Sequence, residues 1–148
     1  MNSVLQQAFG EGSIKLSQEC LSWRESFEVA GAALVESNRT TSAYTQEMIQ
    51  AFEELGPYMV IAPGIALAHG RPSVSVLETG LSLVTLKTPV EFGSSTNDPV
   101  SLVIGLAALD HDSHIDLMAA LSELLMSEET VNLLLNAANE SDVRSYLS

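Results

Sequence analysis

Three histidines are the clearest candidates for reversible chemistry near neutral pH: His69, His111 and His114. An imidazole has an ordinary pKa of about 6.5, so near pH 7 it is a neutral nucleophile. It is also a good leaving group once it has been modified. The residues around each histidine therefore indicate what it can do.

His69 has the most specific setting of the three. It follows the apolar segment 65–68, which is typical of a buried strand, and it precedes Gly70 and Arg71. Ligand sites in open α/β sheets lie at the carboxyl ends of strands. Gly70 would leave room for another molecule to approach, and the planar guanidinium of Arg71 suits a phosphate group. The pattern also fits a histidine that merely ends a strand and bonds a backbone carbonyl.

His111 and His114 lie at the start of a helical pattern. Ser113 and Asp116 resemble a capping box, which predicts that a helix begins at Ser113. This places His114 in the first helical turn and His111 in the preceding loop. Free N–H groups at a helix start attract anions, so Ser113 and His114 are candidates to bind a phosphoryl group. A surface cap without any ligand fits the local sequence equally well.

A metal site is the main alternative for the histidines. Three imidazoles could in principle hold a zinc ion for a metal-dependent hydrolase. However, the common two-histidine zinc motif spaces its ligands four residues apart on a helix, whereas His111 and His114 are three apart. We therefore expect neither a metal nor another cofactor.

Other catalytic motifs are missing from the sequence. Cys20, the single cysteine, has no basic neighbour to lower its pKa, so we expect a buried, inert thiol. The sequence has no Gly-x-Ser-x-Gly elbow, Walker A motif or Gly-x-Gly-x-x-Gly loop. A serine hydrolase and direct nucleotide binding are accordingly not expected.

Charge and hydropathy exclude further classes. The 148 residues carry a formal net charge of −13, and the six basic residues are scattered along the chain. Nucleic-acid binding needs clustered Lys and Arg, and an anionic membrane surface would repel this chain. Apolar runs such as residues 100–109 are too short to cross a bilayer, and the N-terminus does not resemble a signal peptide. We expect a soluble, cytoplasmic protein without nucleic-acid partners or direct membrane insertion.

Apolar spacing predicts the secondary structure. We expect helices that begin at or directly after Ser22, Ser113, Ser127 and Ser141, and one over residues 42–55. Strands are predicted over residues 59–62, 65–68, 81–86 and 100–108, with Pro89 helping to end the third. This order predicts an α/β fold: a single three-layer domain over residues 1–148, with a mixed sheet of about five strands flanked by helices.

A known family shares the region around His69. The bacterial phosphoenolpyruvate-dependent sugar phosphotransferase system has enzyme IIA components whose phosphorylation-site region resembles residues 54–72, ELGPYMVIAPGIALAHGRP. The resemblance is to the mannitol/fructose family, whose pattern is an apolar strand followed by Pro-His-Gly. It is greater to the L-ascorbate-type branch, on the stretches 56–58, 61–64, 69–72, 79–86 and 97–100.

The resemblance implies a phosphocarrier. His69 matches the histidine that the family phosphorylates, and His114 matches its second active-site histidine, which orients the group or stabilises its charge. The implied donor is the phosphohistidine protein HPr, the acceptor is a cysteine of enzyme IIB, and the membrane enzyme IIC is served indirectly. The implied transport substrate is L-ascorbate. A regulatory protein of the same fold, which accepts phosphate but feeds no transporter, is the alternative.

Two positions depart from the family pattern. Ala68 stands where the family usually has proline, and alanine can adopt the same extended backbone. Mannitol-type members have an arginine upstream, where this chain reads Phe52-Glu53-Glu54. Arg71 is a candidate to supply that positive charge. Gly70 and Ser113 are further candidates to contact the phosphoryl group or a partner.

Overall fold

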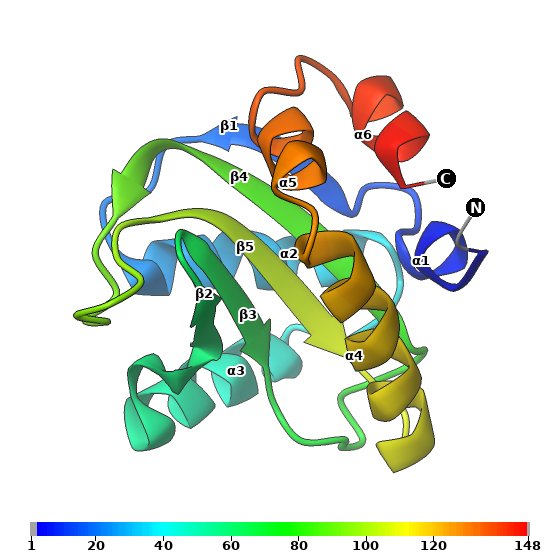
Figure 1. Cartoon of the computed structure of the whole chain (residues 1–148). Coiled ribbons are helices and arrows are strands. Elements are labelled where there is room, and N and C mark those ends of the chain that lie inside the picture. The colour runs from blue at the N-terminus through cyan, green and yellow to red at the C-terminus, as the bar shows by residue number, and fades with distance from the viewer. Residues whose placement is uncertain (1–2, 148) are drawn as a thin grey trace.

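Helices cover both faces of a five-stranded sheet in the computed structural model, which describes residues 3–147 (Figure 1). The helices are α1 (Ser3–Ala8), α2 (Trp23–Glu36), α3 (Ala43–Leu55), α4 (His111–Leu125), α5 (Glu128–Leu135) and α6 (Glu140–Tyr146), with a 3-10 turn, η1, at Pro57–Met59. The strands are β1 (Ile14–Gln18), β2 (Val60–Ala62), β3 (Ile65–His69), β4 (Gly80–Val90) and β5 (Val100–Ala107). The predicted α/β fold, with a mixed sheet between layers of helices, is confirmed.

The strand order is β1-β4-β5-β3-β2, which places β5 at the centre. The pairs β3–β5 and β1–β4 are parallel, whereas β4–β5 and β2–β3 are antiparallel. All residues of β5 except Ser101 are buried, as its nearly continuous apolar run predicts. The parallel register sets His69, the last residue of β3, opposite Leu106 near the end of β5.

The two faces of the sheet bury separate cores. In β3, Ala66 and Ala68 pack in the core formed with α2 and α3. Ile65 and Leu67 pack in the opposite core, formed with α1, α4, α5 and α6. Side chains alternate along a strand, so His69 leaves the sheet on the face that α4 covers. The strand period thus decides which helix lies beside the imidazole.

Aromatic rings anchor α3 in the first core. Phe27 of α2 and Phe52 of α3 meet edge to face, with their ring centroids 5.4 Å apart. Trp23 lies 4.1 Å from Phe52 between centroids, and Phe92 closes the cluster. These contacts fix α3 against α2 and hold it beside the end of β3.

Several predicted helix ends are confirmed. Ser22 caps α2 by accepting the N–H of Glu25 at 3.2 Å, and Ser127 caps α5 by accepting the N–H of Thr130 at 3.2 Å. Gly56 ends α3 with a φ of +75°, a conformation that suits glycine.

The predicted starts of α4 and α6 were wrong. Asp110 caps α4, its Oδ1 accepting the N–H of Ser113 at 2.8 Å, so His111 is the first helical residue and not part of a loop. Asn139 caps α6 in place of Ser141. In both cases a short polar side chain on extended backbone reaches the N–H three residues later, which is the geometry of an N-cap.

Strand β4 is longer than predicted and runs through Pro89 to Val90. Pairing between β4 and β5 is irregular between Thr85 and Val90, so the missing N–H of Pro89 removes no regular ladder bond. The sequence analysis also missed α1 and β1. They are only six and five residues long, and polar residues interrupt both, so neither is a continuous apolar run like that of β3.

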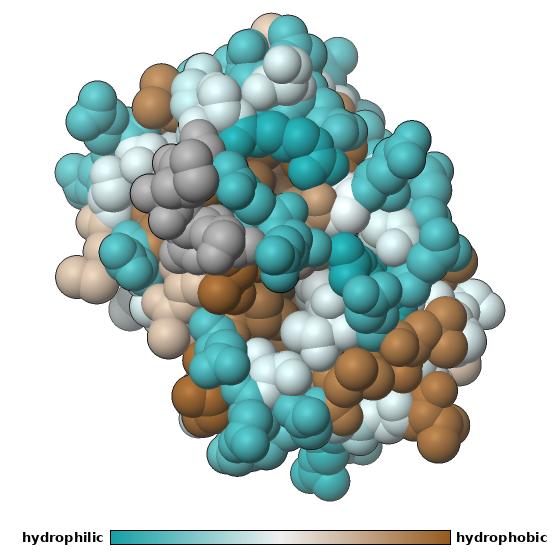
Figure 2. Space-filling model, turned by 90° about the vertical axis from the view of Figure 1, so that its right-hand side faces the viewer, coloured by the Kyte–Doolittle hydropathy of each residue, from teal (hydrophilic) through white to brown (hydrophobic). Residues whose placement is uncertain are grey.

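One face of the molecule shows the distribution of hydrophilic and hydrophobic residues on the surface (Figure 2). Figure 2 shows the face that carries both ends of the described chain, where hydrophilic residues are mixed with residues of intermediate hydropathy and hydrophobic residues gather at the lower right. Within residues 3–147, no helix combines the length and apolar character needed to cross a membrane. Cys20 is buried, as predicted, and burial, followed by the charges of Glu25, Glu19 and Glu28, raises the pKa of its thiol.

At Gly31, α2 lies directly against Thr45 of α3, so Gly31→Ala should destabilise the protein. An added Cβ would lie 2.8 Å from Cβ of Thr45, which no side-chain rotation relieves. We expect a loss of about 1–3 kcal/mol in the free energy of unfolding, measured by urea denaturation. Without this contact, the same change within a helix would gain roughly 1 kcal/mol.

The matched control for Gly31→Ala is Ala32→Gly, on the exposed side of α2. This variant should lose about 1 kcal/mol through helix propensity alone. If Gly31→Ala proved more stable than the wild type, the close approach of the two helices would be contradicted.

Candidate active site

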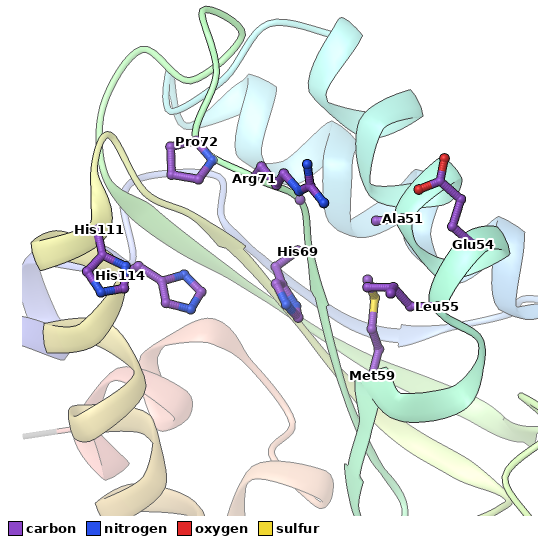
Figure 3. A pocket seen from close by; sticks show the side chains of 10 residues that line it. Ala51, Glu54, Leu55, Met59, His69, Arg71, Pro72, His111 and His114 are labelled. Atoms are coloured by element: carbon purple, nitrogen blue, oxygen red, sulfur yellow. The ribbon is translucent and has the colours of Figure 1, made fainter.

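A pocket of about 280 Å³ opens where β3 ends (Figure 3). All three histidines line it: His69 from the end of β3, and His111 and His114 from the first turn of α4. Gly70 and Arg71, from the segment after β3, line it too, and α3 and η1 supply mainly apolar side chains. The fold therefore brings together four of the predicted site residues and adds His111.

The hydrogen bond of His69 fixes its tautomer. Nδ1 lies 3.0 Å from the carbonyl oxygen of Leu67. A carbonyl can only accept, so Nδ1 carries the proton of the neutral ring and Nε2 keeps its lone pair. Within residues 3–147, Nε2 has no hydrogen-bond partner. The imidazole is half-buried and presents a free nucleophilic nitrogen.

His114 reaches from α4 toward His69 (Figure 3). The two ring centroids are 5.9 Å apart and the ring planes are inclined by 51°. Burial lowers the pKa of His114, and positive charge on His69 and on His111 lowers it further. His114 is therefore neutral near pH 7 and can donate a single hydrogen bond to a group placed between the rings.

Ser113 does not line the pocket. Its N–H is donated to the carboxylate of Asp110, and the N–H of His114 is bonded to the carbonyl of Asp110 at 3.1 Å. Hydrogen bonds from Ser113 lower the pKa of Asp110, which keeps a negative charge at the helix start. The helix end thus already holds an anion of its own, and His114 reaches the pocket through its side chain alone.

Gly70 lies beside α3 in the wall of the pocket. Its φ is not positive, and an added Cβ would lie 3.4 Å from Cε1 of Tyr44 and 3.6 Å from Cβ of Glu47, which is ordinary van der Waals contact. Neither the backbone nor the packing against α3 therefore requires glycine at this position, and room for an approaching molecule stays a prediction.

Arg71 lies at the rim of the pocket, on the side of α3 (Figure 3). Its side chain is exposed, and it takes part in none of the ion pairs among residues 3–147. A guanidinium without a carboxylate partner is available to an anion bound at His69.

Two residues of α3 were missed as parts of the site. Tyr44 Oη accepts the N–H of Gly70 at 2.9 Å, and Glu47 accepts the hydroxyls of Ser73 and Ser75. The helical pattern placed Tyr44 on a buried face, where a tyrosine needs a partner for its hydroxyl. That need was a usable signal, but the partner could not be identified from the sequence.

The geometry does not favour a metal centre. Across the described residues, no group of three His, Cys, Asp or Glu side chains is arranged to hold a metal ion. The alternative of a hydrolase that uses the three histidines around a metal therefore has no structural support in this part of the chain.

Comparison with known proteins agrees with this chemistry. The family described as "Phosphoenolpyruvate-dependent sugar phosphotransferase system, EIIA 2" matches residues 7–148. The mannitol-specific cryptic phosphotransferase enzyme IIA component of Escherichia coli (strain K12) is 37% identical over 144 residues, covering 97% of each chain. The ascorbate-specific PTS system EIIA component of the same strain is 39% identical over 132 residues, covering 88% of this chain and 86% of the relative.

A solved structure shares the fold. In the complex of enzyme IIAMTL and phosphorylated enzyme IIBMTL from Escherichia coli, the matching chain is 28% identical, with a TM-score of 0.82 over 93% of this chain and 95% of that chain. Because the family match and the relatives above 30% identity extend along nearly all of the sequence, this chain belongs to the EIIA 2 family of the phosphoenolpyruvate-dependent sugar phosphotransferase system and is a phosphotransferase component that carries a phosphoryl group.

Proposed function

We propose that His69 is the phosphorylated residue and that Nε2 is its nucleophilic atom. The hydrogen bond between Nδ1 and the carbonyl of Leu67 is the observation that carries this proposal, because it leaves the lone pair on Nε2. The place of His69 at the end of β3, in the wall of an open pocket, supports access by a partner protein.

Transfer to and from His69 is a pair of displacements at phosphorus. The Nε2 lone pair attacks the phosphorus of a donor phosphohistidine, the P–N bond of the donor breaks, and its imidazole leaves with the bonding electrons. A cysteine thiolate of the acceptor then attacks the same phosphorus, and the electrons of the P–Nε2 bond return to His69. Positive charge develops on the ring while Nε2 is bonded to phosphorus. The carbonyl of Leu67 therefore stabilises the transition state more than the free imidazole.

His114 and Arg71 are the groups proposed to stabilise the phosphoryl oxygens. The His114 ring lies near His69, and as a neutral imidazole it can donate a hydrogen bond toward the group on Nε2. Arg71 offers a full positive charge from the α3 side of the pocket. Arg71 would thereby replace the upstream arginine of mannitol-type members, and Gly70, which has no side chain, would leave the pocket wall beside His69 open to a partner.

The proposed donor is HPr, and the proposed acceptor is a cysteine of enzyme IIB that serves a membrane enzyme IIC. The Escherichia coli complex of a structural relative with phosphorylated enzyme IIB supports the acceptor. Large apolar side chains in or beside the segments that line the pocket are exposed, as a docking surface requires: Leu55 by 57%, Val74 by 98% and Ile115 by 51%. We place this exchange in the cytoplasm.

L-Ascorbate is the proposed substrate of the transport system. The stretches 56–58, 61–64 and 69–72 resemble the ascorbate-type branch, and an ascorbate-specific relative is 39% identical. The mannitol-specific relative, at 37% identity, makes mannitol the alternative. Transfer rates to ascorbate-type and mannitol-type enzyme IIB test this choice, and failure to transfer to either would favour a regulatory role.

Replacing His69 with alanine should abolish phosphorylation and leave the fold intact, because a half-buried residue at a strand end contributes little packing. Wild-type protein incubated with phosphoenolpyruvate, enzyme I and HPr should gain one acid-labile phosphoryl group by mass spectrometry. His111→Ala is the control, since it keeps Nε2 of His69. Normal phosphoryl uptake by His69→Ala would contradict the assignment.

His114→Ala should slow phosphoryl transfer without removing the nucleophile. Loss of one hydrogen-bond donor to the phosphoryl oxygens costs about 10²-fold in rate. His111→Ala should have a much smaller effect, because among the described histidines it is His114 whose ring pairs with that of His69, with centroids 5.9 Å apart. Quenched-flow measurement of transfer from each phosphorylated variant to enzyme IIB checks this order, and the reverse order would exchange the two roles.

Because the fold lowers the pKa of His114, acidification should reduce the free energy of unfolding. The unfolded chain binds a proton at His114 before the folded protein does, so the free energy of unfolding should fall as the pH drops below about 6.5. In His114→Asn this fall, measured by urea denaturation at about pH 7 and about pH 5.5, should be smaller. An equal fall in both proteins would show that His114 is not held neutral in the fold.

A further inference from the structure

Tyr44 makes contacts that the transfer steps above do not use. It lies in the first turn of α3 and is 1% exposed. Its hydroxyl accepts the N–H of Gly70 at 2.9 Å and donates to the carbonyl of Leu106 at 2.8 Å. Gly70 directly follows His69, and Leu106 lies opposite His69 in the register of β3 and β5. One buried hydroxyl therefore joins the two strand ends beside the nucleophile.

The Tyr44 hydroxyl keeps its proton near neutral pH. Burial raises the pKa of Tyr44 to about 12, with an opposing effect of the bond to Gly70 and a small further rise from Glu47. The hydroxyl therefore stays protonated near neutral pH and can accept and donate at the same time. One turn along α3, Glu47 accepts the hydroxyls of Ser73 and Ser75, so the same helix holds the segment at a second point.

The orientation of the imidazole depends on this stretch of backbone. His69 Nδ1 bonds the carbonyl of Leu67, two residues earlier on its own strand, so the ring direction follows the dihedral angles at the strand end. Without the Tyr44 hydroxyl, the N–H of Gly70 and the carbonyl of Leu106 would each lose a buried partner. The strand end would have to move to recover those bonds, and His69 would move with it.

We propose that Tyr44 is a positioning residue for phosphoryl transfer, whose hydroxyl sets the backbone of His69 and Gly70 and thereby the direction in which Nε2 faces the donor. This inference rests on the phosphocarrier function proposed above. It assigns α3 a part in the chemistry, although the Tyr44 hydroxyl acts through the backbone and does not touch the phosphoryl oxygens.

The test is Tyr44→Phe, which removes one oxygen and keeps the ring. In single-turnover transfer from phosphorylated HPr, we expect the rate constant at saturating HPr to fall by about 10²-fold, as for a slightly misplaced reacting atom. The HPr concentration that gives half the maximal rate should stay the same. In ¹⁵N spectra of the imidazoles, His69 should change from a single Nδ1–H tautomer to a mixture.

Ser82→Ala is the matched control. Ser82 is fully buried, and its hydroxyl donates to the carbonyl of Ala30 at 2.9 Å, outside the pocket. This variant should lose thermal stability to a degree similar to Tyr44→Phe while keeping the wild-type rate and His69 spectrum. If Tyr44→Phe also keeps both, Tyr44 is merely structural and the inference is wrong.

Two further outcomes keep the conclusions separate. If wild-type protein itself takes no phosphate from HPr, the proposed function fails, whatever Tyr44 does. If Tyr44→Phe does not fold, amide hydrogen exchange of the wild type tests whether the Tyr44 hydroxyl holds the strand end. The Gly70 amide should exchange far more slowly than the amide of exposed Arg71, and equal rates would overturn the inference.

Discussion

The parallel pairing of β3 with β5 is the constraint on which the site depends. Residues 65–69 pair one for one with residues 102–106, and β5 is buried along nearly its whole length. A slip by one residue would turn His69 to the α2 and α3 side and bring the residues of one core onto the face of the other. The hydrophobic pattern of two whole layers therefore holds the imidazole on the side where His114 lies.

The other wall of the pocket depends on close packing between α2, α3 and the sheet. Gly31 allows α3 to approach α2, and Gly105 leaves space for Ser82, where an added Cβ would clash. The aromatic cluster around Phe52 then fixes the position of α3. As a result Tyr44 reaches the strand ends, and the segment after β3 runs along α3.

The sequence predicted the parts of the site that depend on local pattern. A strand followed by His69 and Gly70 is such a pattern, and so is the sheet of apolar strands between helical segments. The prediction of where α4 begins was wrong because Asp110 and Ser113 are both good N-cap residues. Only the backbone conformation decides which of the two side chains meets a free N–H. The hydrogen bond of Tyr44 to Leu106 could not be predicted, for a different reason. The two residues are 62 positions apart, so only the topology brings them together.

The negative charge of the protein opposes an anionic phosphoryl group only when it is counted over the whole chain. The net charge is −13, but exposed charges further away than about 8 Å are largely screened at physiological salt. Near the pocket, the carboxylates of Glu47 and Asp110 accept hydrogen bonds from serines, Glu54 lines the pocket on the α3 side, and Arg71 takes part in none of the ion pairs among residues 3–147.

The lowered pKa of His114 also suits a carrier, which must release its phosphoryl group as readily as it accepts it. A fixed positive charge in this place would oppose the charge that develops on the His69 ring during attack. A neutral imidazole avoids this repulsion and, in the role proposed for His114, still donates a hydrogen bond to the phosphoryl oxygens. Burial of His114 beside two other histidines, which lowers its pKa, is therefore consistent with the proposed part of this residue in transfer.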